Sequence, residues 1–131
     1  MVISSFASTF EGVGMASIRD LVAAIRRREG VEAAIVLGRD GLLIDSQALP
    51  GLDPEDLAAR IPPIISAADE LGMACQRGGL VTCVLEHGHG LAIVSVLNSD
   101  AVLCVLLQPA ANVGQLLFEL RRNREHIAAL V

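Results

Sequence analysis

Three apolar runs dominate the second half of this 131-residue chain. They cover residues 80–85, 91–97 and 101–107, and only short polar or glycine-containing segments separate them. Connections of this length join antiparallel strands as hairpins. Antiparallel strands with one face in water alternate apolar and polar residues, whereas continuous apolar runs are expected where both faces are covered. The pattern therefore predicts three antiparallel strands in a sheet that is covered on two sides.

The first half of the chain predicts a helix followed by a hairpin. Ser17 can cap a helix that runs to about residue 29, with apolar residues on one stripe and a glycine after its end. Residues 31–37 and 42–46 then resemble two strands joined by a tight turn in which Gly41 tolerates a positive φ.

Two further helices complete the predicted order. Asp53 followed by proline and two acids is a strong helix start, and this middle helix should reach about residue 75. Pro62-Pro63 inside it should bend it or separate its first turns from the rest. Residues 113–130 predict a final amphipathic helix. The order is helix, two strands, helix, three strands, helix.

The fold class expected is α/β, of the α+β kind, with one domain over residues 17–131 and a mobile or extra segment over residues 1–16. Two helices should cover one face of the five-stranded antiparallel sheet and one helix the other. Five strands span about 24 Å, and one helix covers only about 10 Å. The middle helix alone would leave apolar sheet exposed, so we expect a homodimer.

The middle helix has more apolar surface than one sheet contact uses. Its apolar positions span an arc of about 200° at 100° per residue. A neighbouring helix could pack on one flank, while charged side chains bordering the arc face something else. The alternative is that the wide stripe is buried within one subunit. The charged residues are Asp56, Arg60, Asp69, Glu70 and Arg77.

Composition argues against nucleic-acid and membrane partners. The net charge is -5, and the chain has no Trp, no Tyr and no Lys, so it offers few groups for phosphates or bases. Mean hydropathy is high at +0.56, but no apolar run approaches the ~20 residues that span a bilayer. The three cysteines and the lack of a secretion signal in residues 1–16 predict reduced thiols and a cytoplasmic protein.

No catalytic, cofactor or metal site is expected, and the chain should not be an enzyme. Cys75, Cys83, His87 and His89 do not have the paired spacing of zinc ligands. No glycine-rich loop leads into Lys-Ser or Lys-Thr, which excludes a P-loop nucleotide hydrolase.

Several short motifs, in this order and spacing, resemble the roadblock family, also described as the dynein light-chain roadblock type. The resemblance covers about residues 17 to 131. The motifs are residues 30–37 (GVEAAIVL), residues 39–42 (RDGL), Asp53 opening Leu57-Ala58, residues 102–106 (VLCVL) and residues 112–116 (NVGQL).

This resemblance implies a profilin-like roadblock fold and a dimer in which the third strands pair and the middle helices lie side by side. It also implies a non-catalytic regulator or scaffold of Ras-like small GTPases, as in bacterial gliding-motility modules. Pro62-Pro63 departs from the uninterrupted helix of the family. The dimer interface implied comprises Ile61, Ile64, Ile65, Ala68 and Leu71 on the helix and Leu80, Val81, Thr82, Cys83, Val84 and Leu85 on the strand.

The leading hypothesis is a cytoplasmic homodimer that binds a small GTPase through the charged positions Asp56, Arg60, Asp69, Glu70 and Arg77. One alternative is a structural adaptor that joins other proteins and never meets a GTPase. Another is a small-molecule sensor, which the scarcity of convergent polar groups disfavours and which a cavity of several hundred cubic ångströms in the monomer core would favour.

Overall fold

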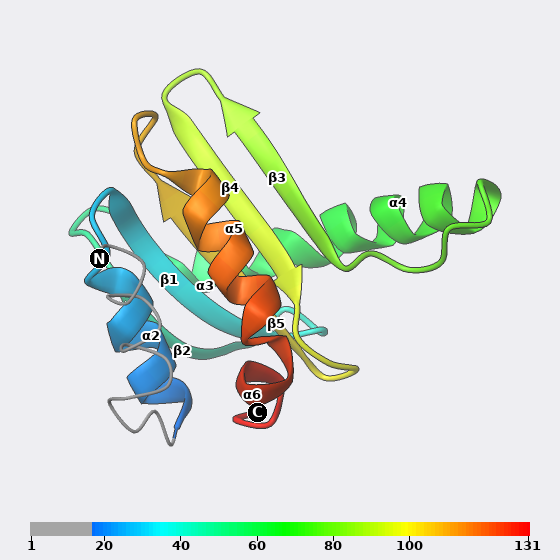
Figure 1. The fold of residues 1–131 in the computed structure, drawn as a ribbon, viewed down its shortest axis with the longest axis horizontal. Coiled ribbons are helices and arrows are strands. Elements are labelled where there is room, and N and C mark those ends of the chain that lie inside the picture. Colours follow the sequence, from blue (N-terminus) through cyan, green and yellow to red (C-terminus); the bar gives the residue numbers. More distant parts are fainter. Residues whose placement is uncertain (1–16) are drawn as a thin grey trace.

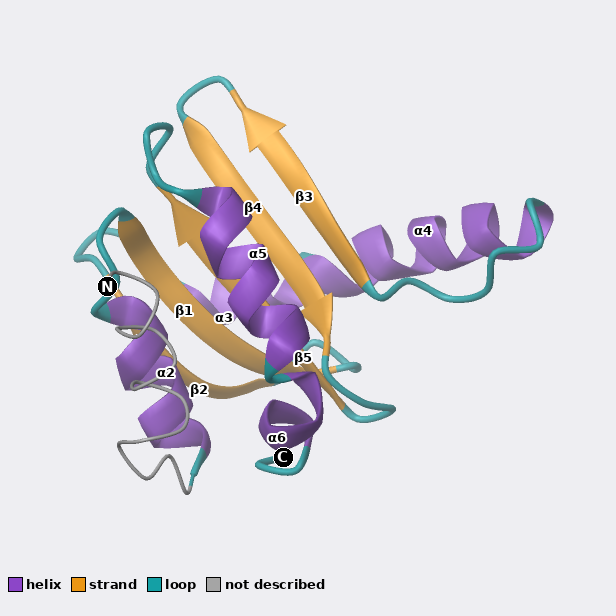
Figure 2. Ribbon diagram, viewed as in Figure 1, coloured by secondary structure: helices purple, strands orange, loops and turns teal. Residues whose placement is uncertain are grey.

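The computed structural model describes residues 17–131 and shows a five-stranded antiparallel sheet between two layers of helices (Figures 1 and 2). The strand order is β2-β1-β5-β4-β3, so β2 and β3 are the two edges. The expected fold class is confirmed. The elements are α2 (Ile18–Arg26), β1 (Val31–Gly38), β2 (Leu43–Ala48), α3 (Pro54–Ala59), α4 (Ile61–Ala74), β3 (Thr82–His87), β4 (Gly90–Val96), β5 (Ala101–Leu107), α5 (Val113–Arg122) and α6 (Arg124–Ala128).

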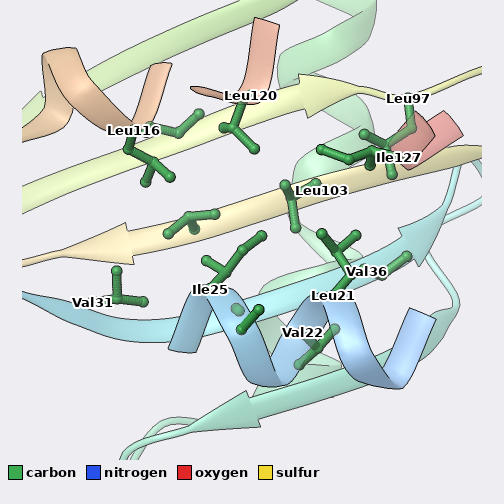
Figure 3. Packing of buried hydrophobic residues seen from close by; sticks show 14 of the residues in the cluster. Leu21, Val22, Ile25, Val31, Val36, Leu97, Leu103, Leu116, Leu120 and Ile127 are labelled. Carbon is green, nitrogen blue, oxygen red and sulfur yellow. The ribbon is translucent and has the colours of Figure 1, made fainter. Parts of the chain in front are cut away.

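One face of the sheet packs against α2, α5 and α6, and this is the larger of the two cores (Figure 3). Leu21 and Ile25 of α2, Leu116 of α5 and Ile127 of α6 are almost completely buried there. They meet alternate side chains of β1, β4 and β5, as the period of two in a strand requires. The prediction that the first and last helices share one face is confirmed.

The other face packs against α3 and the first turns of α4. Ala58, Ile61 and Ile65 contact a second cluster that includes Ile35 of β1 and Cys104 of β5. The central strands β1 and β5 are therefore covered on both sides, which explains their continuous apolar sequences. The edge strands β2 and β3 are only partly buried.

Several predicted boundaries differ from the structure. The first helix ends at Arg26 rather than near residue 29, and the third strand begins at Thr82 rather than residue 80. The final helix is not continuous, because it breaks at the buried Asn123. The side-chain amide of Asn123 donates a hydrogen bond to the Glu119 carbonyl oxygen at 2.8 Å. The prediction made for residues 1–16 lies outside the described residues.

Candidate interaction face on the middle helix and the edge strand

The predicted middle helix is divided into α3 and α4 at Arg60. Asp53 caps α3, because its Oδ1 accepts hydrogen bonds from the Glu55 and Asp56 amides at 3.1 and 3.3 Å. Pro62 and its neighbouring proline fall in the first turn of α4, where helical amides have no intrahelical acceptor. The two prolines are tolerated at this place because they begin a new helix, and α4 is free to take its own direction.

Much of α4 lies beyond the sheet of its own chain. Its buried residues, Ile61 and Ile65, both belong to its first five positions. Leu71 and Met73 are each 69% exposed, and Figure 1 shows the second half of the helix extending past the β3 edge. Apolar side chains there have no sheet beneath them in the single chain.

The loop between α4 and β3 is held in place by side-chain and backbone hydrogen bonds. The Asp69 carboxylate accepts a 2.6 Å bond from the Leu80 amide and lies 3.5 Å from the Arg39 guanidinium. The Gly72 carbonyl oxygen accepts bonds from the Arg77 amide at 2.7 Å and from the amide that follows. The projecting helix and the start of β3 therefore keep a fixed relation to each other.

The outer edge of β3 is suited to pairing with another strand. It runs in continuous register with β4, without a bulge or proline, and its one acidic residue, Glu86, lies near the end of the strand. Edge strands that remain unpaired usually carry such features. The opposite edge, β2, has a register shift opposite Val36/Leu37, and the Asp45 carboxylate accepts a bond from the Ser46 amide. Of the two edges, β3 is the less protected.

The structure divides the predicted interface residues into two groups. Ile61 and Ile65 are 7% and 4% exposed against their own sheet, so they have almost no surface left for a second subunit. The remaining predicted positions keep accessible surface. Leu71, Val81 and Val84 are exposed, and Ile64, Ala68, Leu80, Thr82, Cys83 and Leu85 are half-buried.

The predicted partner contacts are also not equivalent. Asp56 and Arg60 form an exposed ion pair at 3.1 Å, and the hydrogen bond and charge of Asp56 raise the pKa of Arg60. Glu70 and Arg77 are exposed. Asp69 is half-buried and accepts the hydrogen bond from the Leu80 amide, which holds the loop.

Sequence reasoning missed Met73, although its position near the end of an almost entirely apolar helix was a usable signal. The thiols of Cys83 and Cys104 are not activated. Burial raises the pKa of Cys83, and it raises that of Cys104 to about 12.

Within residues 17–131 no cluster of three or more His, Cys, Asp or Glu side chains could hold a metal ion. In the same part of the chain, no helix is long and apolar enough to cross a membrane.

Comparison with known proteins agrees with this architecture. An uncharacterized protein of Methanocaldococcus jannaschii is 28% identical over 106 residues, which cover 81% of this chain and 92% of that protein. A Roadblock/LC7 domain from Streptomyces avermitilis has a TM-score of 0.76 at 22% identity, covering 86% of this chain and 96% of that one. The gliding protein MglB from Thermus thermophilus has a TM-score of 0.75 at 16% identity, covering 86% of each chain. The Roadblock/LC7 domain model matches residues 18–107, and the chain therefore belongs to the Roadblock/LC7 domain family.

Proposed function

We propose that this chain forms a homodimer through β3 and α4, and that the dimer acts in the cytoplasm as a non-catalytic regulator or scaffold of a Ras-like small GTPase. Membership of the Roadblock/LC7 family and the structural similarity to the gliding protein MglB support this proposal. So does the resemblance noted in the sequence, which implies GTPase regulation for this family.

The observation that carries the dimer is that one arrangement would cover two exposed features at once. The open β3 edge needs a strand, and the projecting half of α4 needs an apolar surface beneath it. A two-fold axis beside β3 would place a second β3 against the first and continue the sheet. Each projecting α4 would then lie under the sheet of the other subunit.

The seam of this dimer differs from the one expected from sequence. Because Ile61 and Ile65 are already buried in one chain, the helix contribution comes from Ile64, Ala68 and Leu71. The strand contribution comes from residues 81–85, among which Val81 and Val84 are the most exposed apolar side chains.

The GTPase would contact the side of the middle helices that faces away from the sheets. Asp56 and Arg60 at the α3–α4 junction, and Glu70 and Arg77 further along, are exposed and able to pair with charges of a partner. The chain has no metal or nucleotide motif of its own. Its action on hydrolysis would come from reshaping or anchoring the GTPase.

Light scattering after size exclusion tests the dimer, and a nucleotide-dependent binding assay tests the partner. We expect a mass of about 27.4 kDa, twice the 13.7 kDa of one chain. We also expect binding to a small GTPase encoded near this gene, with different affinity for its GDP and GTP-analogue forms. Glu70→Arg should weaken that binding and leave the dimer mass unchanged, because Glu70 is exposed and outside the seam.

The possible results separate the two parts of the proposal. A monomer at micromolar concentrations would overturn the dimer and with it the proposed partner surface. A dimer that binds no GTPase in either nucleotide state would overturn the GTPase role and favour a structural adaptor.

A further inference from the structure

A hollow of about 550 Å³ lies between the end of α2 and the start of α5, in the helix layer opposite α4. It is open to solvent on one side. Neither the proposed dimer nor the proposed GTPase contact uses it. The residues around it are Ala24, Arg27, Arg28, Glu29, Gly30, Val31, Leu107, Gln108, Ala110, Ala111, Asn112, Gln115 and Leu116.

Two chain segments that line the hollow are already in close contact with each other. The Gly30 carbonyl oxygen accepts a 2.8 Å bond from the Gln108 amide. Gly30 has a φ of +86°, and a Cβ at this position would lie 2.7 Å from the Cβ of Ala111. On the α5 side, the Asn112 side chain accepts a 3.0 Å bond from the Gln115 amide. A ligand would therefore meet a shape that needs little ordering, which lowers the entropic cost of binding.

The lining of the hollow combines apolar and charged side chains. Its apolar part, called the floor below, comprises the buried Ala24, Leu107 and Leu116. Its charged part, called the rim below, carries the exposed Arg27 and the half-buried Arg28. A ligand suited to both parts combines an apolar group with a negatively charged one, because guanidinium groups bind carboxylates with paired hydrogen bonds.

Two acids moderate the charge of this rim. Glu29 is exposed beside the arginines, and the buried Glu119 lies close enough to Arg28 to act on its pKa. Burial lowers the pKa of Arg28, and the Glu119 charge works in the opposite direction. Arg28 is thus partly compensated from inside the protein, and Arg27 is the more accessible cation for a ligand.

The surrounding helix layer is basic although the whole chain is acidic. Residues 17–29 and 113–131 contain seven arginines and four acids, whereas residues 53–77 of the opposite layer contain two arginines and five acids. This separation of charge would draw an anionic partner to the α2 and α5 side and away from α3 and α4.

We propose that the hollow binds an acidic segment of a protein partner, with a carboxylate on Arg27 and a neighbouring apolar side chain on the floor. A pocket for a small molecule usually buries 70–90% of its ligand, and a hollow open on one side suits a side chain of a larger partner better. Since the site lies on the face opposite α4, a dimer could hold such a segment while its middle helices remain accessible.

The test uses the full chain and a fluorescein-labelled peptide made of leucine and glutamate, with a leucine and lysine peptide for comparison. Fluorescence anisotropy measures affinity, and amide chemical shifts in two-dimensional NMR locate the bound peptide. We expect the acidic peptide to shift the amides of Gly30, Gln108 and Ala111. Arg27→Gln should weaken binding about five- to tenfold, which corresponds to about 1–1.4 kcal/mol.

Two further variants make the role of charge specific. Glu29→Gln should strengthen binding of the acidic peptide, because it removes a like charge from the rim. Arg19→Gln, in the first turn of α2 and also exposed, should change the affinity much less. All three positions are on the surface, so these substitutions should leave the fold intact.

The proposal would be overturned by tighter binding of the lysine peptide, by chemical shifts centred on α3 and α4, or by equal effects of Arg19→Gln and Arg27→Gln. Competition by free glutamate at the concentration of the peptide would show a small-molecule site instead. Arg27-dependent binding to phosphatidylserine vesicles, without binding of the acidic peptide, would show a membrane contact. None of these results bears on the mass of the dimer, so this site and the proposed function fail separately.

Discussion

Replacing Leu71 by alanine tests the proposed contact of the projecting helix most directly. Leu71 is 69% exposed in the single chain. Complete burial of a leucine side chain contributes about 1.5–3 kcal/mol, so the exposed part offers about 1–2 kcal/mol to each subunit. Two copies in a symmetric dimer offer about 2–4 kcal/mol. Leu71→Ala should therefore raise the dimer dissociation constant by about 30- to 700-fold.

Sedimentation velocity over a range of protein concentrations measures this constant. The matched control is Leu42→Ala, because Leu42 is also 69% exposed but immediately precedes β2, the opposite edge strand. It should remove a similar apolar area without affecting the dimer. The inference from the projecting helix is refuted if both variants have the dissociation constant of the unmodified protein, or if both raise it to the same extent.

Four further substitutions, one of them a control, test the contacts inside one chain. In Gly72→Ala the new Cβ would collide with a carbonyl oxygen of the following loop, so urea denaturation should show a loss of about 1–3 kcal/mol. Gly88→Ala, where a Cβ meets nothing within 4 Å, should change stability by less than about 0.5 kcal/mol. Asp69→Ala should cost about 1–3 kcal/mol and accelerate hydrogen exchange of the Leu80 amide, which loses its acceptor. Burial raises the pKa of Cys104 from its ordinary 9.0 to about 12, so this thiol ionises at a lower pH in the unfolded chain than in the folded one. The stability present below pH 9.0 should therefore fall as the pH rises toward about 12, and it should fall less in Cys104→Val. Disulfide reagents should modify Cys104 only as fast as the chain unfolds.

Local signals in the sequence predicted the elements well, because each depends on residues that are neighbours in the chain. Asp53 was expected to cap a helix, and its carboxylate does accept bonds from two amides of the first turn. Gly41 was expected in a tight turn with positive φ, and its φ is +90°. The continuous apolar runs of β1 and β5 correctly indicated strands covered on both faces.

The parts that were not predicted depend on contacts between distant residues. Asp69 was grouped with exposed charges, since nothing near it in sequence reveals that its carboxylate accepts a bond from the Leu80 amide, eleven positions later. The burial of Ile61 and Ile65 against their own sheet depends on where α4 crosses it, which a helical pattern alone does not specify. The break at Asn123 arises from a side-chain bond to the Glu119 carbonyl that competes with the helical pattern.

The dimensions of α4 fit the proposed dimer, in which a second copy covers its projecting half. The helix has 14 residues and a length of about 21 Å. Its buried side chains end at Ile65, the fifth of these residues, so the remaining nine extend for about 13 Å. This length matches between two and three strand spacings of about 4.8 Å. Cys83 and Leu85 lie on the face of β3 that α4 covers, and they are only half-buried beside their own helix. In a two-fold dimer the projecting half of each α4 would reach beneath β3 and β4 of the other subunit, so the surface that one chain leaves uncovered is of the size that its copy can supply.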